Sequence, residues 1–345
     1  MNLEGKLRLL CEAVGVSGDE GAACRRAAEM LREYTDDVRV DGNLSVLANV
    51  YDAGEDKPKL LLDAHIDEIG MIVTHIEDGG FVKVSGLGTD ARLMLAQEVV
   101  LHGEKDIPGV ILAKAPHLTK PEERKKVPET KELWIDTGYQ KEELEKILMP
   151  GDRVTMKGGF TKLQGDFVSS KALDDRSCVA CILAALEELK GEELPVSLTV
   201  AFSSQEEVGC RGAVTAAYQA NADMAIALDV GFGMSPGVEK RDCGELGKGP
   251  QIGFAPALDR HISKKLVELA KAENIPFQYD VMGSGTGTNA DGISVSRGGV
   301  RTGLISLPLR YMHMPIEVVR LCDIEAVGRL LAAFIRQADQ VGRDF

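Results

Sequence analysis

The chain has 345 residues, of which 44% are hydrophobic and 27% are charged, and its formal net charge is −14. A chain of this length predicts a main domain and a smaller one, because a single core stops growing at about 250 to 300 residues. The negative charge disfavours nucleic acid and anionic lipid as partners, since both would repel it. The sequence has no run of about 18 apolar residues that could span a bilayer, so no membrane partner is expected.

The cysteines and the N-terminal segment predict a cytoplasmic protein. Seven cysteines are odd in number and scattered, unlike a disulfide framework, which is typical of a reducing compartment. The segment 1–20 lacks the charged and then apolar pattern of a secretory signal. Cys178 and Cys181 have Cys-x-x-Cys spacing, but they fall in an apolar helical stretch. This context favours buried small residues over a redox or metal role.

Helices open the chain and strands follow. After a first helix, Ser17 and Glu20 have the spacing of a capping box, which predicts a second helix that ends near Tyr34. Two strands then flank an Asp-Gly-Asn turn. The apolar run Lys59–Ala64 is typical of a strand buried on both faces, and it ends directly at His65.

A β-rich insert is expected next, over residues 67–165. Alternating apolar and polar residues with Gly and Pro turns predict short antiparallel strands there. One hairpin is expected about Asp78-Gly79-Gly80, and a second in the segment VVLHGEKDIPGVILAK.

Alternating helices and strands resume after the insert. The expected elements are a helix at 174–190, a strand at 196–203, helix 212–220, strand 224–229, helix 259–273, a strand near 279, helix 291–297, strand 301–307 and helix 323–341. Strands separated by helices pair mainly in parallel. The predicted fold class is therefore α/β, with a mainly parallel mixed sheet flanked by helices and an inserted β-barrel-like domain. The larger domain comprises residues 1–66 and 166–345.

Acidic and histidine residues follow three of the predicted apolar strands. His65 and Asp67 end the first, Glu206 and Glu207 follow the second, and Asp229 ends the third. In a sheet of this kind, ligands bind at the carboxyl ends of the strands. A single residue of this type is most often structural, and Asp229 alone reads as a turn residue. Because such residues follow three different strands, a common site is favoured.

Asp174 and His313 are further candidates. Asp174 and Asp175 stand where a helix begins, which fits either helix capping or a carboxylate that bridges two cations. His313 is expected in a loop, because Pro315 follows it closely.

The candidate ligands are two histidines and three carboxylates, a set that suits two divalent ions, with Zn²⁺ expected and Co²⁺ or Mn²⁺ as alternatives. Two such ions can polarise a carbonyl and acidify a shared water. The neighbouring acids Glu206 and Glu207 repel each other unless their roles differ. We therefore expect Glu207 to bind metal and Glu206 to act as general base.

Several motifs resemble those of the tetrahedral (TET-type) metalloaminopeptidases, also named glutamyl aminopeptidases or cellulase-M-like endoglucanases, nearly from end to end. They are AHIDEIG at 64–70, KALDDR at 171–176, EEVGCRGA at 206–213, ALDVG at 227–231, GTNADG at 287–292 and RYMHMPIEV at 310–318. The resemblance implies a zinc-exopeptidase-like fold and removal of N-terminal residues from short peptides.

Site roles and assembly are also implied by the resemblance. The residues that would hold one metal are His65 and Asp229, those for the other are Glu207 and His313, and Asp174 would bridge both. Asp67 would orient His65, and Glu206 would be the general base. The β insert would mediate dimerisation, and dimers would assemble into a hollow dodecamer that admits peptides.

Two positions depart from the family pattern. Met314 stands where Ser or Thr is usual, and Asn289 stands where the glycine-rich stretch more often has Asp. Both are expected near the pocket, so they bear on substrate preference.

Alternative functions remain open at this point. A related two-metal deacylase or carboxypeptidase would use the same ligands. A catalytically inactive metal-binding assembly protein would keep the assembled shell without catalysis. A glycosidase needs a pair of carboxylates without a required metal, so the histidines disfavour it. The stretch Gly283–Gly287 lacks the Lys-Ser/Thr ending of a phosphate-binding loop.

Overall fold

An eight-stranded mixed sheet forms the larger part of this computed structural model, which describes residues 2–120, 122 and 126–342. The strand order is β1-β2-β12-β3-β13-β16-β14-β15. In this order the bounds are Val38–Val40, Val46–Tyr51, Ser197–Ser203, Lys59–His65, Met224–Phe232, Arg301–Leu309, Gln251–Phe254 and Gln278–Val281. The four central strands β12, β3, β13 and β16 are parallel, and antiparallel pairs occur towards both edges. The predicted mainly parallel mixed sheet is confirmed.

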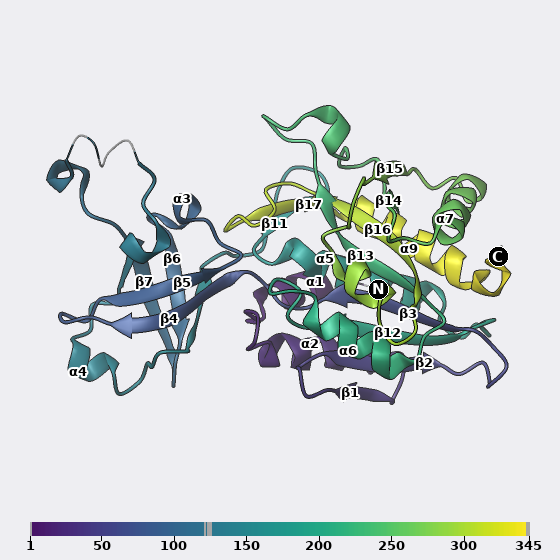
Figure 1. The fold of residues 1–345 in the computed structure, drawn as a ribbon, viewed down its shortest axis with the longest axis horizontal. Coiled ribbons are helices and arrows are strands. Elements are labelled where there is room, and N and C mark those ends of the chain that lie inside the picture. Colours follow the sequence, from purple (N-terminus) through teal and green to yellow (C-terminus); the bar gives the residue numbers. More distant parts are fainter. Residues whose placement is uncertain (1, 121, 123–125, 343–345) are drawn as a thin grey trace.

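Helices cover both faces of this sheet (Figure 1). One face packs against α1 (Leu3–Glu12), α2 (Gly21–Leu31), α5 (Leu173–Glu188), α7 (Arg260–Ala272) and α9 (Leu321–Ile335), and the other against α6 (Arg211–Ala220) and α8 (Asn289–Ser294). Successive strand residues point to opposite faces, so Leu60 and Leu62 join the first core and Leu61 joins the second. This explains why β3 is apolar throughout.

A closed six-stranded barrel lies at one end of the elongated molecule (Figure 1). Its strands, in the order β4-β5-β8-β7-β6-β9, are Gly70–Ile76, Val82–Leu87, Trp134–Asp136, Asp106–Leu112, Glu98–His102 and Arg153–Met156. Short helices connect them: α3 (Ala91–Met94), α4 (Lys141–Leu144), η1 (Pro116–Leu118) and η3 (Thr130–Glu132). Both expected hairpins are present, as the pairs β4/β5 and β6/β7. The expected β-barrel-like insert is therefore confirmed.

A small third sheet pairs two strands that follow the barrel in the chain with one strand that precedes the last helix. It consists of β10 (Thr161–Lys162), β11 (Phe167–Ser170) and β17 (Glu317–Arg320), all antiparallel. Two further turns of 3₁₀ helix are η4 (Lys240–Asp242) and η5 (Ala338–Gln340). No helix in the described ranges is both long and apolar enough to cross a bilayer.

The start of the second helix differs from the prediction. Ser17 does not cap it, because its hydroxyl donates to Asp67 Oδ2 at 2.7 Å, and α2 begins only at Gly21. Glu20 occupies the N-cap position, but its side chain makes no capping bond to the helix within the described chain. A tertiary contact to a buried carboxylate has replaced the local capping box.

The C-terminal elements differ from prediction in their bounds. Helix α8 begins at Asn289 instead of 291, because the Thr288 hydroxyl accepts a hydrogen bond from Ala290 N. The last helix, α9, covers Leu321–Ile335 and ends before the predicted residue 341. Strand β13 continues past Asp229 to Phe232, so this acid lies within a strand and not at a turn.

Candidate active site

The three predicted acidic clusters meet at one edge of the sheet. Strands β12, β3 and β13 are neighbours and run parallel, so their carboxyl ends lie side by side. Ser203 at the end of β12 pairs with His65 at the end of β3, and Glu206 follows three residues later. Asp229 is carried by β13 on the other side of β3. Each side chain therefore reaches the common edge from a different strand.

His65 is buried among carboxylates. Its Nδ1 lies 3.2 Å from the carbonyl oxygen of Asp67 and 3.4 Å from Asp67 Oδ1. Its Nε2 lies 3.0 Å from Asp174 Oδ1. Burial alone would lower the pKa of His65, but the hydrogen bonds with Asp174 and Asp67 outweigh it and raise the pKa well above its usual range. The surroundings of this imidazole therefore favour a positive charge.

His313 faces the second oxygen of the Asp174 carboxylate. Its Nε2 lies 3.2 Å from Glu207 Oε2 and 3.5 Å from Asp174 Oδ2. The two oxygens of Asp174 thus face two different histidines. The hydrogen bond with Glu207 raises the pKa of His313. As Pro315 predicted, His313 lies in a loop, which leads into β17.

Like charges are concentrated around these histidines. Burial raises the pKa of Asp229 well above its usual range, and the charges of Asp174 and Glu206 add to this against the opposing charge of His65. Burial also raises the pKa values of Glu206 and Glu207. Buried carboxylates that crowd one site in this way favour a positively charged partner.

The donor atoms fit a divalent cation. Asp174, Glu207 and His313 each offer an atom within 4.8 Å of the others, and so do His65, Asp175 and Asp229. Glu207 Oε1 accepts no hydrogen bond from any described residue, although it is buried. Imidazole nitrogens with carboxylate oxygens suit Zn²⁺, Co²⁺ and Mn²⁺.

Asp67 lies beneath the cluster instead of facing the cavity. Its Oδ1 accepts a hydrogen bond from Glu206 N at 3.0 Å, and its Oδ2 accepts one from Glu207 N at 3.2 Å. Burial would raise the pKa of Asp67, but its hydrogen bonds with His65, Ser17 and Glu206 N and the charge of His65 together outweigh burial and lower the pKa. Asp67 therefore contacts the groups that carry the cluster.

Two further acids contact the cluster, and of these Glu317 escaped the sequence predictions. Glu317 is buried, and it accepts hydrogen bonds from Asp174 N at 2.9 Å and His313 N at 3.2 Å. Asp175 Oδ2 accepts one from His65 N at 3.1 Å, and the peptide bond that precedes Asp175 is cis. An acid within the otherwise apolar start of β17 was the available signal for Glu317. The capping function considered for Asp174 is not supported, because its two oxygens face His65 and His313, and Asp174 and Asp175 both have non-helical backbone angles within α5.

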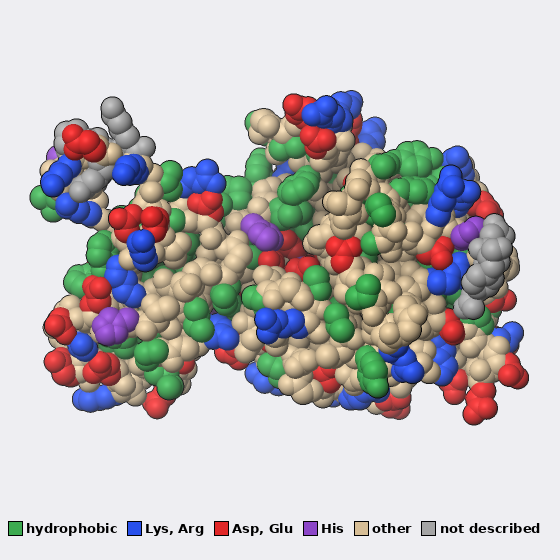
Figure 2. Space-filling model, viewed as in Figure 1, with side chains coloured by type: hydrophobic (Ala, Val, Ile, Leu, Met, Phe, Trp, Pro, Cys, Tyr) green, Lys and Arg blue, Asp and Glu red, His purple; other side chains and the backbone are tan. Residues whose placement is uncertain are grey.

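The cluster lines one side of a cavity of about 790 Å³. Figure 2 shows acidic and histidine side chains gathered in a hollow of the face in view. Apolar side chains contribute to the other walls: Phe232, Val281, Met282, Leu304 and Met312. Neither Asn289 nor Met314 is among the lining residues. Asn289 is fully buried and donates to Asp63 Oδ2 and Ser203 Oγ, both at 2.8 Å, so it lies behind the wall of the cavity, next in the chain to the lining residue Thr288.

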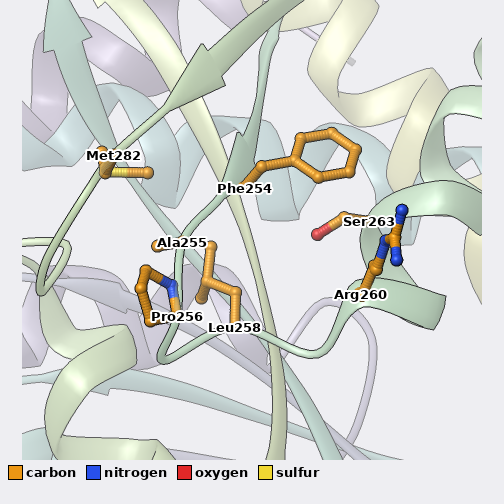
Figure 3. Close-up of a pocket in the computed structure, with 7 residues that line it drawn as sticks. All are labelled: Phe254, Ala255, Pro256, Leu258, Arg260, Ser263 and Met282. Atoms are coloured by element: carbon orange, nitrogen blue, oxygen red, sulfur yellow. The ribbon is translucent and has the colours of Figure 1, made fainter.

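A second cavity of about 250 Å³ adjoins the first, and Met282 lines both. Figure 3 shows its lining of Phe254, Ala255, Pro256, Leu258, Arg260, Ser263 and Met282. This lining includes no acid or histidine, so it lacks groups for metal binding or proton transfer.

The cysteines play no part in the cluster of ligands. All seven lie among the described residues and are free thiols. Cys178 and Cys181 are buried in α5, as the sequence predicted. Cys210 is half-buried, and its thiol donates to Glu206 Oε1 at 3.4 Å.

Comparison with known proteins identifies the family. Residues 45–330 match the family described as M42 glutamyl aminopeptidase. The chain belongs to this family. The lysyl aminopeptidase of Pyrococcus furiosus is 30% identical over 341 residues, which cover 96% of each chain.

Solved structures of the family have the same fold. An aminopeptidase from the archaeon Desulfurococcus kamchatkensis is 35% identical, with a TM-score of 0.90 over 97% of this chain and 94% of that one. The TET1 peptidase of Pyrococcus horikoshii is 31% identical, with a TM-score of 0.82 over 97% of this chain and 99% of that one. The resemblance to TET-type aminopeptidases is therefore confirmed.

Proposed function

We propose that this M42 family member is a two-metal aminopeptidase that removes N-terminal residues from short peptides. The observation that carries the proposal is the carboxylate of Asp174, whose two oxygens face His65 on one side and His313 on the other. A carboxylate placed in this way is suited to bridge two cations.

The proposed ligands follow from this geometry. His65 and Asp229 would hold one ion, Glu207 and His313 the other, and Asp174 both. The close approach of His313 Nε2 to Glu207 Oε2 and Asp174 Oδ2 supports the second set. Asp175 lies near the first set, but one of its oxygens already accepts the backbone N–H of His65, which favours Asp174 as the shared ligand.

Two divalent ions, with Zn²⁺ expected and Co²⁺ or Mn²⁺ as alternatives, would supply Lewis-acid polarisation of the scissile carbonyl and an acidified water at neutral pH. Glu206 is left free of this ligand set and lines the cavity. A carboxylate oxygen of Glu206 would take the proton of the attacking water and pass it to the leaving amine. Burial, which raises the pKa of Glu206, brings it towards the range in which a carboxyl group both accepts and donates a proton.

The assembly is a second part of the proposal. The Pyrococcus horikoshii relative is described as assembling into a tetrahedron or a large octahedral shell. By analogy we propose that dimers of this chain form a dodecamer, with residues 67–165 as the dimerisation and substrate-access domain and residues 1–66 and 166–345 as the catalytic domain. The free cysteines support a cytoplasmic location.

A metal-replete digest of a peptide library tests the proposal. We expect loss of single residues from free N-termini, abolished by a chelator and restored by Zn²⁺ or Co²⁺. N-acetylated copies of the same peptides and N-acyl amino acids serve as matched controls. Cleavage of the N-acyl compounds would indicate a deacylase, release from C-termini a carboxypeptidase, and two bound ions per chain without turnover an inactive metal-binding protein.

A further inference from the structure

The segment that carries Glu206 and Glu207 joins β12 to α6 without regular structure. Gln205 has a left-handed backbone with φ of +56°, a conformation that non-glycine residues adopt rarely. Two adjacent acids in a partly buried segment repel each other. External contacts must therefore hold this backbone in place.

Two buried carboxylates accept three successive backbone N–H groups of this segment. Gln205 N donates to Glu20 Oε1 at 3.2 Å. The next two, Glu206 N and Glu207 N, donate to Asp67. Because these hydrogen bonds are buried, water does not compete for their donors and acceptors.

Glu20 comes from a distant part of the chain, 185 residues before Gln205. Its side chain is fully buried, and the same Oε1 also accepts Gly18 N at 2.7 Å. Its Oε2 is buried and finds no hydrogen-bond partner in the part of the chain that the structure describes. An unpartnered buried oxygen destabilises a protein, and the side chain does not cap α2, so local helix stability does not account for this glutamate.

We propose that Glu20 is a positioning residue of the active site, which fixes the backbone at Gln205 and thereby the direction in which Glu206 enters the cavity. The inference rests on the proposed function of Glu206 as general base. Glu20 does not line the cavity and is not a catalytic residue. Its contribution depends on how far its side-chain oxygen extends towards Gln205 N and not on the charge of the carboxylate.

Three variants of Glu20 separate the position of its acceptor oxygen from the charge of its carboxylate. Glu20→Gln keeps an acceptor oxygen at the same reach without the charge, so we expect kcat within about 3-fold of the wild type. Glu20→Asp keeps the charge but is one methylene shorter, and Glu20→Ala removes the acceptor. For both we expect kcat to fall about 10- to 100-fold, the size of effect that a small misplacement of a catalytic group produces, with KM and bound metal nearly unchanged.

Asp323 offers a matched control for loss of stability. It is also buried and accepts two backbone N–H groups, from Gly247 at 2.6 Å and Gly249 at 2.9 Å, but none of the three lines the cavity. We expect Asp323→Ala to lower the melting temperature and leave kcat per folded molecule unchanged.

The kinetics of these purified, metal-loaded proteins on one tripeptide decide the question. A higher kcat for Glu20→Gln than for Glu20→Asp supports the inference. This comparison remains valid even if Glu20→Ala does not fold. Equal kcat in the Gln and Asp variants, or Asp above Gln, would overturn it. If the wild type hydrolyses no peptide, the proposed function fails; if the wild type is active and all folded Glu20 variants match it, only the role of Glu20 fails.

Discussion

The barrel and the large sheet differ in what they bury. The barrel interior is aliphatic, and Thr155 is the one buried polar residue among the described residues from 70 to 156. The sheet buries acids at its carboxyl edge, among them Asp67, Asp174 and Glu317. The barrel therefore buries apolar side chains with little cost, whereas the sheet carries a buried group of like charges that costs stability.

The acids at the sheet edge also divide by function. Asp174, Glu206, Glu207 and Asp229 face the cavity. Glu20, Asp67 and Glu317 lie behind them and accept backbone N–H groups of the segments that carry the first set. The difference between barrel and sheet leads to opposite expectations for mutations in the two regions.

The largest expected effect is that of Glu206→Gln. Removing the proposed general base should lower kcat by about 10²- to 10⁴-fold, because proton transfer by a positioned side chain contributes this much. The melting temperature should stay the same or rise, since one buried like charge is lost. Steady-state kinetics and thermal unfolding check both parts, and activity within 3-fold of the wild type would rule out the mechanism.

The barrel should respond in the opposite way. Ile111 on β7 is fully buried, whereas its neighbour Val110 is 39% exposed and points outward. We expect Ile111→Ala to cost about 2 to 5 kcal/mol of unfolding free energy with kcat per folded molecule unchanged. Val110→Ala is the control and should cost less than about 1 kcal/mol. Equal losses from both substitutions in denaturant titrations would show that the barrel core is not the source of its stability.

The pH dependence of stability sharpens the contrast. Burial raises the pKa of Glu20 from about 4.5 to about 7. A raised pKa adds stability that is fully present below pH 4.5 and is lost as the pH rises through 7. Glu20→Gln does not titrate, so its stability relative to the wild type should improve between pH 4.5 and pH 8, by about 2 to 3 kcal/mol. Denaturant unfolding of both metal-free proteins at the two pH values measures this, and a constant difference would contradict it.

The smallest expected effect is at the N-cap of α7, which does not line the cavity. Asp259 Oδ1 accepts from His261 N and Ile262 N at the start of α7, and its Oδ2 pairs with Arg301. Asp259→Ala should cost about 1 kcal/mol, and Asp259→Asn less, because asparagine also caps helices well. Kinetics should be unchanged in both. A kcat change above 3-fold would show that α7 is coupled to the site.

Part of the site could be predicted because strand ends are readable in the sequence. The apolar runs before His65, Glu206 and Asp229 indicate parallel strands, and their carboxyl ends must meet. Asp174 and His313 stand outside such runs, so their assignment needed the resemblance to a family.

The supporting acids were not predictable in the same way. Glu20 and Glu317 accept N–H groups of residues far along the chain, and no local pattern encodes that contact. At Ser17 the local pattern was misleading, because the predicted capping box was overridden by a hydrogen bond to Asp67.

The span of these contacts bears on when the enzyme becomes active. Glu20 near one end and Glu317 near the other both fasten residues of the same cluster. A nascent chain that still lacks β17 holds neither His313 nor the acceptor for its backbone. Contacts of such long sequence separation form late in folding. With the ligand set that we propose, synthesis of nearly the whole polypeptide therefore precedes the first complete site, and fragments released early would be inactive.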